Sequence, residues 1–135
     1  MPTIIERKTG ADLYVSPFQT GADANNVHIK VDVSALTARE VDAKGYLKPG
    51  VPLTMAGVLP TVAGDLVVMV EEATRIALDN TGLAAVTNDP AIGCRVYGTV
   101  IHDMLVSILG AELTAGEKAA LNGAGSHLRL TNRSA

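Results

Sequence analysis

The stretch Val27-His-Ile-Lys-Val-Asp-Val33 decides the fold class of this chain, because apolar and polar residues alternate along all of it. Successive side chains of a β-strand point to opposite faces, so a period of two predicts a strand that is buried on one face. The buried face would carry Val27, Ile29, Val31 and Val33. Residues 126–131 alternate in the same way and predict a half-exposed strand near the C-terminus.

Further strands are predicted between these two, where short apolar stretches are separated by glycine and proline. Residues 51–58 form one such stretch. Residues 66–70 show no alternation, which indicates a strand covered on both faces. That strand could continue to Leu78, where the apolar spacing would also suit a helix, and we favour the strand. Residues 92–101 are rich in β-branched side chains and predict another strand, loosened by two glycines.

Helices are predicted only as short pieces. Thr114-Ala-Gly-Glu117 has the pattern of a capping box and predicts a helix of about two turns that stops at Asn122-Gly123. Thr37-Ala-Arg-Glu40 has the same pattern and could open one helical turn. Residues 104–109 either prolong the preceding strand or begin a helix. Turns are predicted at residues 45–50, 79–82 and 88–90.

Length and composition fit one domain with an aliphatic core. A chain of 135 residues is long enough for a single core, and 47% of its residues are hydrophobic but only 3% are aromatic. The pattern of short strands predicts a mainly β (α+β) fold: a small β-barrel or β-tulip-like domain over residues 27–135, with one or two short helices.

Residues 1–26 differ from the rest of the chain. They are mostly polar or small, carry two prolines and two glycines, and show neither a helical stripe nor sustained alternation. We interpret them as an extended N-terminal arm, although an ordinary frayed terminus would have the same composition.

Charge and cysteine content exclude several classes of partner. The net charge of −3 and the scattered aromatic residues argue against a nucleic-acid partner. The single cysteine, Cys94, permits no intramolecular disulfide, and no apolar run reaches the length of a membrane span. We therefore expect a protein made in the cytoplasm that does not bind membranes.

The sequence contains no set of residues that predicts a metal or cofactor site. The three histidines, His28, His102 and His127, lack a second ligand at the spacing that zinc sites use. The first and last of them fall on the polar faces of predicted strands. We expect no cofactor.

Two combinations could suggest catalysis, and neither has a supporting motif. Cys94, His102 and Asp103 could act as nucleophile, base and orienting acid, but a buried and inert cysteine is the simpler interpretation. Glu71 and Glu72 are adjacent in a predicted strand, so their side chains would point to opposite faces and could not share a proton. We expect no enzymatic activity.

Three motifs follow the arm in an order that resembles a known family. They are Lys44-Gly-Tyr-Leu-Lys-Pro-Gly-Val-Pro-Leu53, Val67-Val-Met-Val-Glu-Glu-Ala73, and Asp89-Pro-Ala-Ile-Gly93 leading to Val96-Tyr-Gly-Thr-Val100. Together they resemble the head decoration (capsid cement) proteins of tailed bacteriophages, in the group related to the lambda decoration protein. The resemblance covers roughly residues 30–125, and the tail past Gly110 is longer than in the lambda type.

The resemblance implies a structural protein of the virion without catalysis. Such proteins sit as homotrimers on the outer surface of an icosahedral head and clamp neighbouring subunits of the major capsid protein after the shell expands. Their N-terminal arm meets the capsid, so the capsid-binding residues implied here are Thr3, Ile4, Ile5, Leu13, Tyr14, Val15 and Phe18. The turn adds three interface candidates: Tyr46, Leu47 and Pro49.

Two other classes of function stay open at this stage. A small β-barrel that binds a small molecule would need an apolar pocket with converging polar groups, and the sparse aromatic residues count against it. Composition does not exclude another phage structural component from the tail or neck.

Overall fold

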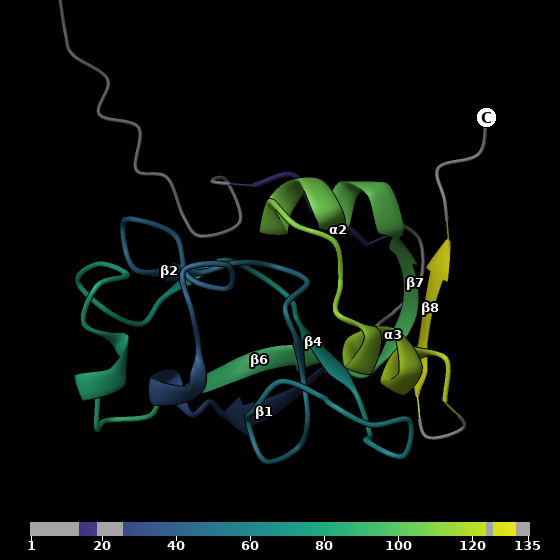
Figure 1. Ribbon diagram of the computed structural model, residues 1–135, viewed down its shortest axis with the longest axis horizontal. Helices are drawn as coiled ribbons and strands as arrows, with labels where there is room; N and C mark the ends of the chain where they lie inside the picture. The colour runs from purple at the N-terminus through teal and green to yellow at the C-terminus, as the bar shows by residue number, and fades with distance from the viewer. Residues whose placement is uncertain (1–13, 19–25, 124–125, 132–135) are drawn as a thin grey trace, which may run out of the picture.

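Residues 14–18, 26–123 and 126–131 are described by the computed structural model (Figure 1). They form a mainly β, α+β structure, which confirms the predicted fold class. The strands form three separate sheets in this part of the chain, with no closed barrel. The strands are β1 (Asn26–Lys30), β2 (Tyr46–Leu47), β3 (Pro52–Leu53), β4 (Val68–Val70), β5 (Thr74–Arg75), β6 (Ala91–Arg95), β7 (Tyr97–Ile101) and β8 (His127–Thr131). The helices are α2 (His102–Leu109) and α3 (Ala115–Leu121), with 3-10 turns η1 (Val33–Ala35) and η2 (Leu83–Ala85).

The largest sheet has the strand order β1-β6-β4-β3, and each neighbouring pair is antiparallel. In β1, Ile29 is buried while His28 and Lys30 are exposed, as the period of two predicts. The strand ends at Lys30, earlier than predicted, because the next two amides do not continue the pairing of β1 with β6. The amide of Val31 donates to Pro90 O, and that of Asp32 donates to Gly57 O, both at 3.0 Å.

β4 is buried at every residue, which confirms a strand covered on both faces. The prediction of a strand over 51–58 is wrong beyond Leu53, because the Thr54 amide donates to Val58 O at 2.8 Å and closes a turn. Nor does the strand at 66–70 continue to Leu78. Instead, Thr74–Arg75 forms the separate strand β5.

A second sheet pairs β5 with β2. β2 lies within residues 45–50, which were predicted as a turn. Gly45 makes this contact possible because its φ is 83° and a side chain there would overlap the carbonyl oxygen of Ala77. The Gly45 carbonyl accepts hydrogen bonds from the amides of Ile76 and Ala77, at 2.9 and 3.3 Å. The tight turn of this segment lies at Pro49-Gly50.

The C-terminal part is a β-α-α-β unit. The strand predicted over 92–101 breaks at Val96 into β6 and β7, and β7 leads directly into α2. β8 pairs with β7 in parallel over five residues, so α2 and α3 form the crossover between them (Figure 1). Residues 104–109 are therefore helical, and the predicted strand at the C-terminus is confirmed as β8.

Both predicted capping boxes make hydrogen bonds, but only one opens a helix. At α3 the Thr114 hydroxyl accepts from the Glu117 amide at 3.1 Å, and the Glu117 carboxylate accepts from the Thr114 amide at 2.9 Å. At Thr37 the carboxylate of Glu40 accepts from the Thr37 amide, but the Thr37 hydroxyl accepts from the Arg39 amide, and the Glu40 amide donates to Thr37 O instead, so the capping box is incomplete. This segment is a turn.

Residues 14–18 of the expected arm lie against the domain. Phe18 is 4% exposed, belongs to the core and forms a bridge with Val100 of β7. The amide of Ile101 donates to Pro17 O at 2.8 Å. For these five residues the structure corrects the expectation of a separate arm, since burial of the only phenylalanine in an aliphatic core is strongly favourable. The remainder of residues 1–25 lies outside the described residues.

Candidate interaction surface

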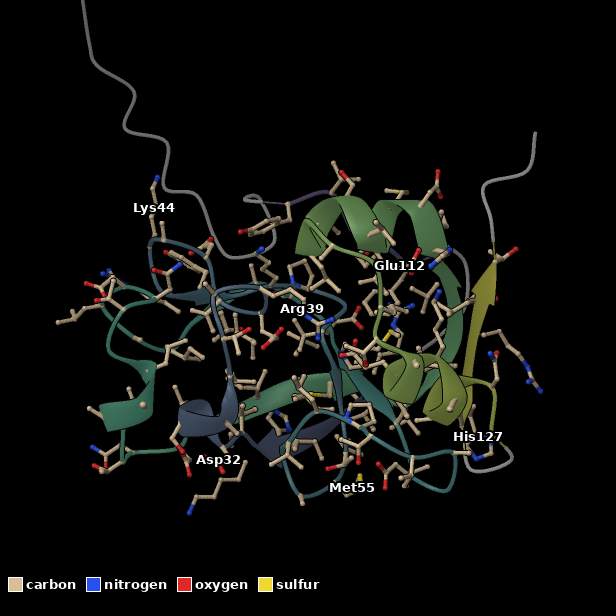
Figure 2. The ribbon with its side chains drawn as sticks, in the orientation of Figure 1. Asp32, Arg39, Lys44, Met55, Glu112 and His127 are labelled. Atoms are coloured by element: carbon tan, nitrogen blue, oxygen red, sulfur yellow. The ribbon has the colours of Figure 1, made fainter. Side chains whose placement is uncertain are left out.

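The loop between β3 and β4 carries, in residues 54–66, three of the large apolar side chains that are exposed in the described part of the chain. Its exposed large side chains are Met55 at 52%, Val62 at 56% and Leu66 at 38% exposed. We call these three residues the loop surface. Figure 2 shows Met55 at the lower rim of the molecule. Met55 and Leu66 line the same hollow and Val62 lies on the same loop, and several exposed apolar side chains on one loop favour a site of protein contact.

The first half of the loop is held in a fixed conformation. The amide of Thr54 donates to Val58 O, and the amide of Gly57 donates back to Thr54 O at 2.9 Å. Gly57 has a φ of 80°, and a side chain there would overlap the carbonyl oxygen of Lys30 in β1. Met55 is therefore presented by a tight turn that packs closely on β1.

The second half of the loop packs on α3. The Asp65 carboxylate accepts hydrogen bonds from the amides of Thr61 and Val62, at 2.9 and 3.3 Å. Gly116 of α3 approaches the backbone of Thr61, where a side chain on the glycine would lie 2.6 Å from the carbonyl oxygen. Val62 is thus exposed on a loop anchored at both ends, which favours a preorganised contact surface.

A hollow of about 690 Å³ adjoins the loop surface and opens to solvent. We call it the loop hollow. Most of its walls are apolar, and one carboxylate reaches it. Among the residues that line it are Ala35, Met55, Val58, Leu59, Asp65 and Leu66.

The expected interface residues of the turn are mostly in the core, which corrects that expectation. Leu47 is fully buried and Pro49 is buried, so neither can contact a partner in this fold. Tyr46 is half-buried. The turn faces inward because β2 pairs with β5 on one side and with Val41 on the other.

The expected arm residues have different positions. Phe18 is in the core beneath Arg95, whose guanidinium carbon lies 4.2 Å from the ring centre, so it is not a free capsid contact. The Tyr14 hydroxyl donates to the Asp42 carboxylate at 2.5 Å, and burial together with this bond raises the pKa of Tyr14. Val15 is 71% exposed. Thr3, Ile4, Ile5 and Leu13 lie outside the described residues.

Two arginines join the segments that surround these surfaces. Arg39 contacts two carboxylates that are each 1% exposed, binding Glu117 of α3 at 2.7 and 2.5 Å and also Glu40 (Figure 2). Burial acts to raise the pKa of Glu117, but the bonds from Arg39 and from the Thr114 amide keep it below its usual range. This network fastens α3 to the turn at residues 37–40.

Arg95 forms the second network. Its guanidinium binds both oxygens of Glu71, at 2.7 and 2.6 Å, while stacking on Phe18. Glu72, by contrast, is exposed. Glu71 therefore serves an ion pair across the large sheet, and the two adjacent carboxylates have separate environments.

The residues considered for nucleophilic catalysis are not arranged around a common point. Cys94 is fully buried, and burial with the nearby Glu71 raises the pKa of its thiol to about 12, which leaves it protonated at neutral pH. His102 Nε2 lies 2.7 Å from Glu112 Oε1 at the surface, and Asp103 is exposed. Within the described ranges, no three His, Cys, Asp or Glu side chains group as metal ligands would.

None of the helices in the described part of the chain combines the length and apolar character needed to cross a membrane.

Comparisons of the chain with family models, curated proteins and solved structures found no match.

The sequence predictions miss the loop surface because they place Met55 in a strand over residues 51–58 and Leu66 in a strand over residues 66–70, and they give Val62 no role. A signal was present, since Gly57, Pro60 and Gly64 are spaced too closely for regular structure. Val62 lies between Pro60 and Gly64, and Met55 lies two residues before Gly57, so neither is on a regular strand face that could be buried.

Proposed function

We propose that this chain is a structural binding protein that decorates the outer surface of a tailed-phage head and stabilises the expanded shell. One observation carries the proposal: the loop surface exposes Met55, Val62 and Leu66 on a backbone held by hydrogen bonds and close packing. A preorganised apolar surface binds another protein without a large ordering cost. A cementing protein requires this property.

The positions of the family-like motifs are compatible with this proposal. Residues 44–53 form β2, the turn and β3, and residues 67–73 contain β4. The motif that begins at Asp89 forms β6 and β7. These stretches are framework rather than contact surface, so the resemblance concerns the fold, and the binding residues must lie on the loops that this framework carries.

The internal ion pairs support the same role. A decoration protein that folds without disulfides must hold its loops in place by other means. Arg39 ties α3 to the turn at 37–40, and α3 in turn packs on the loop that carries Val62. A rigid frame with many simultaneous contacts suits a protein that binds a repeating lattice, and we propose that it does so as a homotrimer.

The test is binding to expanded, undecorated phage heads, observed by negative-stain microscopy and measured by co-sedimentation. Native protein should decorate the heads, whereas the triple variant Met55→Ser, Val62→Ser, Leu66→Ser should lose at least tenfold in affinity. Leu78→Ser is the matched control, because Leu78 is 84% exposed but lies outside the loop surface. Equal binding by the triple variant and native protein would show that the loop surface is not the contact.

A further inference from the structure

The loop hollow contains a carboxylate that the protein does not neutralise. Asp65 lines the hollow, and one of its oxygens, Oδ2, accepts both amide hydrogen bonds of its own loop. No ion pair to Asp65 occurs among the described residues. The charge of the hollow therefore favours a cationic occupant.

We propose that the loop hollow receives an arginine side chain projecting from the partner protein that docks on the loop surface. This inference rests on the proposed function and names the chemistry that the docking surface recognises. The apolar walls, including Val58 and Leu59, would pack against the aliphatic stem of the arginine, and Asp65 would meet its guanidinium.

Charge and hydration favour arginine over other side chains. An apolar side chain would cover the Asp65 carboxylate without supplying an opposite charge, which is costly even though two amides bond to one of its oxygens. A guanidinium offers five donors and is more weakly hydrated than an ammonium group, so it can pair with the Asp65 carboxylate while its stem lies on apolar walls. Arginine is also among the side chains that contribute most where they fill interface pockets.

The size of the hollow agrees with this occupant. At about 690 Å³ it lies within the range of natural ligand pockets, and it admits one long side chain with its flanking backbone. The opening to solvent suits a side chain presented from another protein surface rather than an enclosed small molecule.

The experiment is an NMR titration of the ¹⁵N-labelled full chain with N-acetyl-arginine N-methylamide. The neutral isostere N-acetyl-citrulline N-methylamide and the corresponding lysine derivative serve as comparison probes. We expect saturable amide shifts confined to residues that line the hollow, with a Kd on the order of millimolar. The citrulline probe should bind at least fivefold more weakly, and lysine should fall between the two.

Asp65→Asn should lower arginine affinity at least fivefold while the loop stays folded, because the asparagine oxygen can still accept the amide bonds of Thr61 and Val62. Asp103→Asn is the matched control, since it removes an exposed carboxylate at the start of α2. Equal shifts with arginine and citrulline in the native protein would overturn the proposal, as would unchanged affinity in Asp65→Asn. The titration needs no phage head, so its failure is distinguishable from a failure of head binding.

Discussion

Replacing Arg39 with methionine should destabilise the domain more than any other change of a single charge. The substitution keeps an apolar stem but removes the guanidinium from Glu40 and Glu117, which are each 1% exposed. Breaking a buried ion pair by removing one partner costs about 3–5 kcal/mol, because the remaining charge is left uncompensated. Arg39 itself is 16% exposed, so we expect the lower end, about 3 kcal/mol.

The loss of unfolding free energy in Arg39→Met should depend on pH, because the buried carboxylates titrate differently with and without the arginine. In the native protein the pKa of Glu117 is lowered, so its stabilising contribution is present above the unfolded pKa and is lost as pH falls through the folded pKa. In Arg39→Met the same carboxyl has lost its partner and stays buried, which raises its pKa. Protonation of Glu117 then removes the unpaired buried charge from the variant. The difference in unfolding free energy between native protein and Arg39→Met should therefore shrink from pH 7 to about pH 4.5.

Urea unfolding followed by circular dichroism at both pH values measures this difference. Arg75→Met is the matched control, because among the described residues that guanidinium donates to the carbonyl oxygens of Ala77 and Leu78 and pairs with no carboxylate. The control should lose less than about 1 kcal/mol at either pH. A cost below about 0.5 kcal/mol for Arg39→Met at pH 7, or one that does not change with pH, would refute the reasoning.

Three further substitutions and one measurement of thiol reactivity test the packing described above. Phe18→Ala should cost about 3–5 kcal/mol because the ring lies in the core, whereas Val15→Ala, at a site 71% exposed, should change the urea midpoint little. Thr114→Ala should cost about 1 kcal/mol by removing the cap of α3, and an unchanged melting temperature would contradict that role. Gly57→Ala should cost at least about 1–2 kcal/mol because of its positive φ, while Gly64→Ala, with open space around it, should be close to neutral by thermal unfolding. The Cys94 thiol, with its pKa raised to about 12, should not react with a thiol reagent at pH 8 until urea unfolds the protein; rapid reaction of the native state would show that the site opens.

The sequence by itself determined the elements whose signal is local. Alternation specifies β1 and β8, because a strand with one buried face needs no information beyond its own residues. The capping box at Thr114 specifies α3, since both of its hydrogen bonds join residues three apart. The unbroken apolar run at Val68–Val70 likewise indicates burial on both faces.

Only the tertiary structure decided which residues face a partner. Phe18, Leu47 and Pro49 have the composition of an arm and a turn, but their burial depends on strands distant in the sequence, such as β7 and β5. The same pattern of threonine followed by glutamate gives a turn at residues 37–40 and a helix at residues 114–117. The two segments differ in the amide that the threonine hydroxyl accepts from, which is Arg39 N at Thr37 and Glu117 N at Thr114. Arg39 then joins them, because it binds the adjacent Glu40 and also Glu117, 78 positions away in the sequence. Exposure of Met55 and Val62 is likewise a property of how the loop packs on β1 and α3, and contacts between distant segments leave no periodic signal along the chain.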